Sequence, residues 1–333
     1  MNIKKIGLTA LAASLVSVSA HAGAISVAGG ASINSEGHSG EQLNAGTTFS
    51  MSNQLTFTGS GELDNGLNVS VSFVLDQGDD ATTVAATSST TVQGGAPFDS
   101  HSVTVSSDSL GTLVFAGEGG SSAATSIDGT AAGDIWDSFD GKGATAAIKV
   151  LDSSPGDNSF FYTLPSVMDG LSVFGSYKPQ GSGAESATGF GFTYSGVEGL
   201  SASYAVTDIE TGTATTSGDQ TVWKLSYAYG PVTAAASNTE MDKAATDSST
   251  DQETSSYAIT YTVSDELSVT YGVDEIANGK TGEIDAEYSK LSASYTAGGM
   301  TISATMAEGD NTHHSTASAE DLEYWALGAS FAF

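Results

Sequence analysis

The chain has 333 residues, of which 39 are acidic and only 9 are basic, so its formal net charge is −30 at pH 7. All the basic residues are lysines, and the chain has no cysteine. This composition excludes nucleic-acid binding, because no basic patch can meet phosphates, and it excludes a disulfide framework and thiolate chemistry.

The first 22 residues have the pattern of an export signal. Lys4 and Lys5 precede a short apolar run, and the segment ends on the small-residue pattern AHA. The apolar run is too short to cross a bilayer as a helix, and no later stretch is long enough. We therefore predict a signal peptide over residues 1–22 and a mature domain over residues 23–333, in which any membrane-spanning segment is a strand.

Beyond the signal, apolar and polar residues alternate along stretches that are separated by two kinds of connection. Alternation with a period of two residues predicts β-strands. Long polar connections alternate with tight turns rich in Gly, Asn and Asp, which supply the positive φ that hairpins need. The tight turns are at residues 64–67, 109–112, 168–171, 197–200, 229–232, 264–267 and 297–300.

These turns divide the mature chain into sixteen predicted strands. The strands are residues 24–33, 45–63, 66–76, 99–107, 112–118, 158–164, 171–178, 187–195, 200–208, 219–229, 232–239, 254–263, 267–274, 284–296, 300–307 and 321–333. Every tight turn follows an even-numbered strand, so all the short turns lie at one end of the sheet and all the long loops at the other. An even strand number with this asymmetry is typical of transmembrane barrels.

The two faces of each predicted strand differ in polarity. In the strand over residues 66–76, the residues Leu67, Val69, Val71 and Phe73 share a face that carries no charge. The final strand has the same pattern and ends on Phe333. Such faces suit a lipid-facing surface, where a basic residue at mid-bilayer would cost about 2–4 kcal/mol.

A soluble β-sandwich would also have one apolar face, so the polar face distinguishes the two folds. In a soluble protein that face usually carries Lys, Glu and Arg, whereas here it is largely Ser and Thr. Aromatic residues such as Tyr229, Tyr261, Tyr295 and Trp325 gather near strand ends, as in interfacial girdles. The sequence therefore predicts an all-β protein with a 16-stranded antiparallel transmembrane β-barrel.

Three parts of the chain resemble the general diffusion porins of Gram-negative bacteria. They are FTGSGELDNGLNVSVSFVLD (57–76), GTLVFAGEGG (111–120) and the terminal Phe333, and the resemblance covers nearly the whole mature length. It implies an outer-membrane location, a homotrimer, and contact with membrane lipid and lipopolysaccharide. It also implies that the barrel-assembly machinery recognises the terminal Phe. It also implies that the loop after the fifth strand, residues 118–157, folds inward and narrows the pore.

The segment expected to fold inward is rich in carboxylates. Those expected at the constriction are Glu118, Asp128, Asp134, Asp137 and Asp140. A cluster of carboxylates at a narrow point favours cations, and a low-dielectric barrel strengthens the effect. The alternative for each residue is that it caps a turn or solvates the loop.

Porins of this family have a cluster of arginines on the barrel wall that faces the acidic residues of the inward loop, but this chain has no Arg. Alternation places Lys178, Lys224 and Lys290 on the polar, lumenal face, so these lysines are the candidate basic wall. We therefore expect little positive charge on that side of the constriction.

The acidic loops could also bind Ca²⁺, although the spacing supports this only weakly. Asp134, Asp137 and Asp140 lack the alternate ligand positions and the final Glu of an EF-hand loop. His313 and His314 beside acidic residues could bind a transition metal, with exposed surface as the alternative. Otherwise we expect no cofactor.

We expect a porin that passes small hydrophilic solutes and ions by passive diffusion and prefers cations. We expect no enzyme, because no histidine lies beside a nucleophile in a recognisable motif. The alternatives are a substrate-specific outer-membrane channel or receptor, and a secreted surface-layer or adhesin β protein.

Overall fold

The computed structural model describes residues 25–40, 46–76, 99–139, 157–179, 185–214, 216–245, 251–279, 284–312, 314 and 321–333. The predicted signal peptide, Asp140 and His313 lie outside the described residues. Within these ranges, no helix is long and apolar enough to span a membrane.

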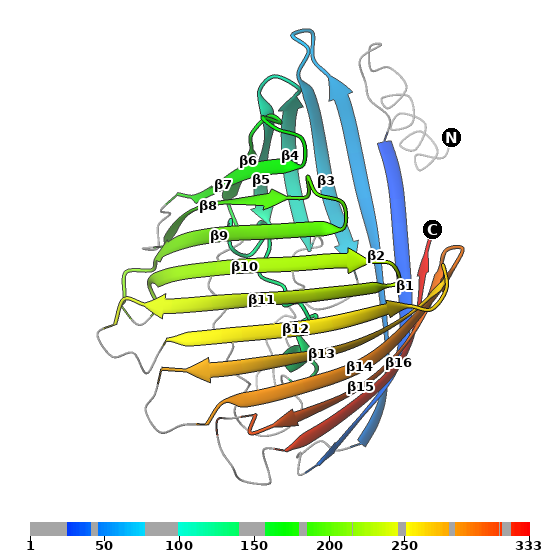
Figure 1. The fold of residues 1–333 in the computed structure, drawn as a ribbon. Helices are drawn as coiled ribbons and strands as arrows, with labels where there is room; N and C mark the ends of the chain where they lie inside the picture. Colours follow the sequence, from blue (N-terminus) through cyan, green and yellow to red (C-terminus); the bar gives the residue numbers. More distant parts are fainter. Residues whose placement is uncertain are drawn as a thin grey trace, which may run out of the picture.

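The described strands, β1 to β16, form one closed antiparallel barrel, in which each strand pairs with its neighbours in the chain and β1 pairs with β16 (Figure 1). The strands are β1 (Ile25–Gly40), β2 (Gly46–Glu62), β3 (Asn68–Asp76), β4 (Ser100–Ser107), β5 (Gly111–Glu118), β6 (Ser159–Thr163), β7 (Leu171–Lys178), β8 (Ser186–Tyr194), β9 (Leu200–Glu210), β10 (Gly218–Tyr229), β11 (Val232–Lys243), β12 (Gln252–Thr262), β13 (Leu267–Asn278), β14 (Ala286–Ala297), β15 (Met300–Asp310) and β16 (Leu322–Ala332). The predicted fold class, strand number and strand order are confirmed.

Several strands extend further toward the long loops than the sequence pattern predicted. β11 ends at Lys243 rather than at residue 239, and β13 ends at Asn278 rather than at residue 274. Charged residues such as Glu240 and Glu275 interrupt the apolar alternation there. Backbone pairing continues past them because main-chain hydrogen bonds do not require apolar side chains once a strand has left the apolar band.

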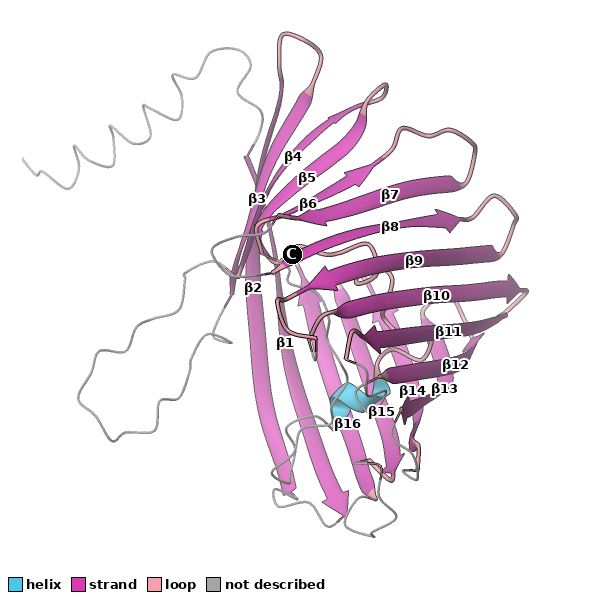
Figure 2. Ribbon diagram, turned by 90° about the vertical axis from the view of Figure 1, so that its left-hand side faces the viewer, coloured by secondary structure: helices cyan, strands magenta, loops and turns pink. Residues whose placement is uncertain are grey.

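Side chains alternate between an outer apolar face and an inner polar face. On β12, Tyr257 and Ile259 are each 59% exposed on the outer face, whereas Ser256, which precedes Tyr257 and lies on the inner face, is fully buried. The burial arises because a segment after β5 covers the inner wall. Its short 3-10 helix η1 (Ile135–Ser138) lies inside the barrel (Figure 2).

The barrel closes between β1 and the end of the chain. The Gly29 N–H donates to the Phe333 carbonyl at 2.8 Å, and the Phe333 N–H donates to the Gly29 carbonyl at 3.0 Å. A Cβ atom added to Gly29 would lie 2.6 Å from the Phe333 ring and 2.8 Å from a Leu55 methyl group. The missing side chain of Gly29 therefore makes room for the terminal aromatic ring at the seam.

We predict that Gly29→Val lowers the yield of closed barrel, because overpacking typically costs about 1–3 kcal/mol. The measurement is the heat-dependent shift in gel mobility that separates folded from unfolded barrels. Gly59→Val is the matched control, since no atom of the described residues lies within 4 Å of a Cβ added at Gly59 on the neighbouring strand. Equal folded fractions for the two variants would contradict this account of the seam.

Candidate pore constriction

Residues 119–139, here called the inward segment, leave β5 and lie along the inner wall. The segment first touches β7 and β9: the Ala123 N–H donates to Ser176 Oγ at 2.8 Å, and the Ala124 N–H donates to Thr207 Oγ1 at 3.0 Å. A Cβ atom added to Gly189, between these strands, would lie 2.9 Å from the Ala123 Cβ. The close approach of the segment thus depends on wall hydroxyls and on a glycine.

The inward segment then follows one cross-strand row of the wall. In register from β10 to β13, that row consists of Lys224, Ser237, Ser256 and Asp274. The Ala131 N–H donates to Ser237 Oγ at 2.8 Å, and the Ala132 N–H donates to Ser256 Oγ at 2.9 Å. Ser237 and Ser256 are paired in register on neighbouring strands, so their hydroxyls lie side by side across the wall. They therefore bind successive peptide groups of a segment that crosses the two strands.

Asp274 is the strongest acceptor in this row. Its side chain is fully buried, and its Oδ2 accepts hydrogen bonds from the Ile135 N–H at 2.7 Å and from Thr130 Oγ1 at 3.4 Å. Hydrogen bonds to a charged group contribute about 1.5–3 kcal/mol each. Sequence reasoning did not single out Asp274; its only signal was a carboxylate on an inner face otherwise made of Ser and Thr.

Two wall lysines bind the backbone of the inward segment. Lys224 Nζ donates to the Gly129 carbonyl at 2.6 Å, and Lys290 Nζ donates to the Gly133 carbonyl at 2.9 Å. Lys178 is elsewhere on the wall, where its Nζ lies 3.5 Å from Glu185 Oε2. All three ammonium groups therefore have acceptors, and those of Lys224 and Lys290 are directed at the segment itself.

Apolar packing fixes the far end of the inward segment. Ile135 is fully buried and Phe139 is 3% exposed, and both belong to a cluster with wall residues of β12 to β16. The Phe139 ring centroid lies 5.7 Å from that of Tyr288 and 6.2 Å from that of Tyr324. Hydrogen bonds and buried rings thus hold the same stretch of chain.

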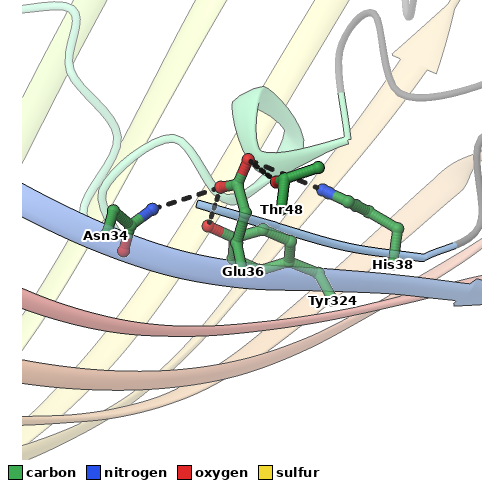
Figure 3. Close-up of polar contacts among 5 residues, drawn as sticks. All are labelled: Asn34, Glu36, His38, Thr48 and Tyr324. Atoms are coloured by element: carbon green, nitrogen blue, oxygen red, sulfur yellow. Dashed lines mark hydrogen bonds and ion pairs between the residues drawn. The ribbon is translucent and has the colours of Figure 1, made fainter. Parts of the chain in front are cut away.

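Tyr324 also belongs to a polar cluster on β1, β2 and β16 (Figure 3). The Glu36 carboxylate accepts hydrogen bonds from the Tyr324 hydroxyl at 3.1 Å, from Asn34 Nδ2 at 3.2 Å and from Thr48 Oγ1 at 3.3 Å. His38 Nε2 lies 4.0 Å from Glu36 Oε1, and its ring centroid lies 5.0 Å from that of Tyr324. Sequence reasoning missed this cluster, because its members come from both ends of the chain.

The carboxylates singled out from the sequence lie in different settings. Asp134 caps a turn: its Oδ1 accepts from the Thr130 N–H at 2.8 Å, and its own N–H donates to Thr130 Oγ1 at 2.6 Å. Asp137 is exposed on η1, and Asp128 is half-buried in the same segment. Glu118 lies apart from them, with its Oε2 3.8 Å from His101 Nδ1 at the start of the segment.

Carboxylates on the outer face of β9 to β16 lie directly opposite one another near the long loops. The like-charged pairs are Asp208–Asp219, Asp219–Asp242, Glu240–Glu253, Glu275–Glu287, Glu287–Asp310 and Glu308–Glu323. Among the described residues, no group of three or more His, Asp or Glu side chains is arranged to hold a metal ion. This belt is therefore a source of repulsion rather than a defined metal site.

We predict that salt stabilises the barrel, because directly opposed like charges destabilise a sheet and salt screens them. The unfolding temperature should rise between low salt and about 1 M NaCl, where the Debye length falls to about 3 Å. Glu253→Gln, which removes the charge opposite Glu240, should raise the unfolding temperature at low salt and weaken its salt dependence. An unfolding temperature that falls or stays constant as salt is added would show that this repulsion does not lower the stability of the barrel significantly.

Comparisons with known proteins agree with this architecture. Residues 7–289 match a family model described as Gram-negative porin. A porin structure refined at 1.8 Å has 17% sequence identity and a TM-score of 0.64, with 93% of this chain and 100% of that chain covered. A loop-deletion mutant of OmpT, an outer membrane protein of Vibrio cholerae, has 14% identity and a TM-score of 0.67, with 93% and 99% covered.

A mutant of the Rh. blastica porin has 15% identity and a TM-score of 0.62, with 93% of this chain and 100% of that chain covered. At these identities the solved structures show a shared fold. A search of curated proteins finds no match.

Proposed function

Since the chain belongs to the Gram-negative porin family and is an outer-membrane β-barrel, we propose that it passes small hydrophilic solutes and ions by passive diffusion and prefers cations. The barrel supplies the water-filled path, and the inward segment supplies the constriction. The channel catalyses no covalent reaction.

One observation carries the cation preference: the lysines beside the inward segment donate to its backbone, while Asp137 of that segment is exposed. Asp128 and Asp134 add negative charge to the same segment. The chain has no Lys or Arg between residues 6 and 141, so strands β1 to β5 contribute no lysine or arginine to the wall. The three carboxylates of the segment outnumber the two lysines bound to its backbone, whose charge a neutral carbonyl does not cancel. A net negative narrowing concentrates cations, and the low-dielectric wall strengthens the field.

Reconstitution into planar bilayers tests the proposal. Stepwise conductance is expected, and the reversal potential in a salt gradient should have the sign of cation preference. The absence of conductance would refute the channel, and an anion-selective potential would refute the selectivity. Swelling of liposomes in sugars and amino acids separates a general pore, which sorts solutes by size, from a substrate-specific channel, which admits one class.

We also propose that residues 1–22 are removed on export, that the barrel is a homotrimer in contact with lipid and lipopolysaccharide, and that Ca²⁺ acts by screening the acidic surface. The porin family supports the trimer, and the opposed carboxylates support the role of cations. The mass of the unheated complex on a denaturing gel tests the trimer. Screening predicts equal stabilisation by Ca²⁺ and by Na⁺ at matched ionic strength, and a larger stabilisation by Ca²⁺ would refute it.

A further inference from the structure

The polar cluster around Glu36 lies on the inner face of the wall, at the end of the inward segment. Figure 3 shows its five side chains on the side of the β1 ribbon that faces the segment. The Tyr324 ring of the cluster packs beside Phe139, the last described residue of the segment, with ring centroids 6.2 Å apart. Glu36 therefore adds a wall carboxylate to the candidate constriction, beyond the carboxylates that the sequence singled out.

The contacts of Glu36 suit a carboxylate that carries its charge. Its Oε2 accepts hydrogen bonds from the Tyr324 hydroxyl and from Asn34 Nδ2, and its Oε1 accepts from Thr48 Oγ1. All three partners donate, and an ionised carboxylate only accepts. The side chain is 13% exposed, so its field is screened less by salt than that of an exposed group. Glu36 is therefore a fixed negative charge on the wall.

His38, two residues further along β1, can change the charge of this cluster near neutral pH. Its Nε2 lies 4.0 Å from Glu36 Oε1, and its side chain is 4% exposed. In register, Tyr324 of β16 and Gly46 of β2 lie opposite His38, and Ala307 of β15 lies opposite Tyr324. Of these three residues only Tyr324 titrates, and a phenol keeps its proton in the neutral and mildly acidic range. A histidine changes its charge between about pH 5 and pH 8.

The geometry of the cluster can hold a protonated His38. A buried charge is tolerated when it is paired and hydrogen-bonded. Protonation makes both ring nitrogens donors, and Glu36 Oε1 is the acceptor beside Nε2. The ring contact with Tyr324, with centroids 5.0 Å apart, keeps the imidazole next to the carboxylate. The carboxylate that the inward segment brings near this cluster is Asp137 of η1, and all the variants below retain it.

We propose that Glu36 is a further selectivity residue of the channel and that protonation of His38 cancels its charge in mild acid. This inference rests on the proposed channel function. At about pH 8 the pair has one negative charge, whereas at about pH 5.5 the imidazolium and the carboxylate sum to zero. The low-dielectric wall carries the field of the pair into the lumen. The preference for cations is therefore stronger at the higher pH.

Reversal potentials in a KCl gradient at about pH 8 and about pH 5.5 test the role of His38. In the unmodified channel, the ratio of cation to anion permeability should fall about twofold at low salt, the factor that a unit charge exerts on a monovalent ion about 10 Å away in water. His38→Gln retains a polar side chain and His38→Phe retains a ring beside Tyr324, and both should keep the high-pH ratio at either pH. His101→Gln, on the outer face of β4, should show the same fall as the unmodified channel.

A matched pair of charge-removing variants tests the role of Glu36. Glu36→Gln should have the lower permeability ratio already at about pH 8, because the wall charge is gone. Glu323→Gln removes a carboxylate from the outer face of the neighbouring strand β16, where the side chain is exposed. This control should keep the ratio of the unmodified channel.

Equal permeability ratios at the two pH values in the unmodified channel would overturn the proposal. A fall that persists in both His38 variants would also overturn it, because protonation of carboxylates elsewhere would then explain the pH dependence. So would a Glu36→Gln channel that is as selective at the higher pH as the unmodified one. Each of these results leaves a cation-selective channel in place, whereas the absence of conductance would overturn the channel and this inference together.

Discussion

Replacing Gly272 with valine is expected to lower the single-channel conductance. Gly272 lies on the inner wall between Ala258 and Lys290, and a Cβ atom added there would lie 2.5 Å from the Ala132 Cβ and 3.1 Å from the Ala132 Cα. Because the wall cannot retreat into lipid without breaking its strand pairing, the inward segment must shift toward the lumen. Such overpacking also costs about 1–3 kcal/mol of stability.

The matched control is Gly30→Val on the inner face of β1. The nearest atom to a Cβ added there is the Phe331 carbonyl oxygen at 3.4 Å, and the inward segment does not contact that position. Bilayer recordings should show an unchanged conductance for this control and a reduced one for Gly272→Val. An identical conductance for the two variants would show that the segment does not bound the pore at Gly272.

Replacing Asp274 with alanine is expected to increase the noise of the open-channel current. The substitution leaves the Ile135 N–H without its acceptor at 2.7 Å and removes negative charge beside Lys290. Loss of a hydrogen bond to a charged group costs about 1.5–3 kcal/mol, so the segment should leave the wall more often. The variance of the current through one open channel measures this motion.

Two conservative variants test whether the effect depends on the contact. Asp274→Asn retains an oxygen acceptor and should be quieter than Asp274→Ala. Glu275→Gln removes a neighbouring charge from the outer face, away from the inward segment, and should leave the noise unchanged. If Glu275→Gln were as noisy as Asp274→Ala, general destabilisation of the strand would explain the effect and the anchoring role would be wrong.

The barrel was predictable from the sequence because its signals are local. Alternation in segments such as residues 67–73 depends on neighbours two residues apart, and turns such as 297–300 need only Gly or Asn in place. The strand ends were less predictable, since charged residues stop the apolar pattern but not the backbone pairing. The extension of β11 to Lys243 shows the difference.

The candidate constriction was less predictable because its contacts join distant residues. Thr130 and Asp274 are 144 positions apart, and Lys290 and Gly133 are 157 apart. Alternation indicates which face a lysine occupies, but not whether its ammonium group binds a carbonyl or stands free in the lumen. For the same reason the acceptor role of Asp274 had no signal beyond its polarity.

The reversal potential across a bilayer in a KCl gradient tests the central claim most directly. That claim is that the three carboxylates of the inward segment outnumber the two lysines bound to its backbone and therefore set the sign of the selectivity. We predict a potential of cation-selective sign, reduced by Asp137→Asn. An anion-selective potential, or one that Asp137→Asn leaves unchanged, would contradict it.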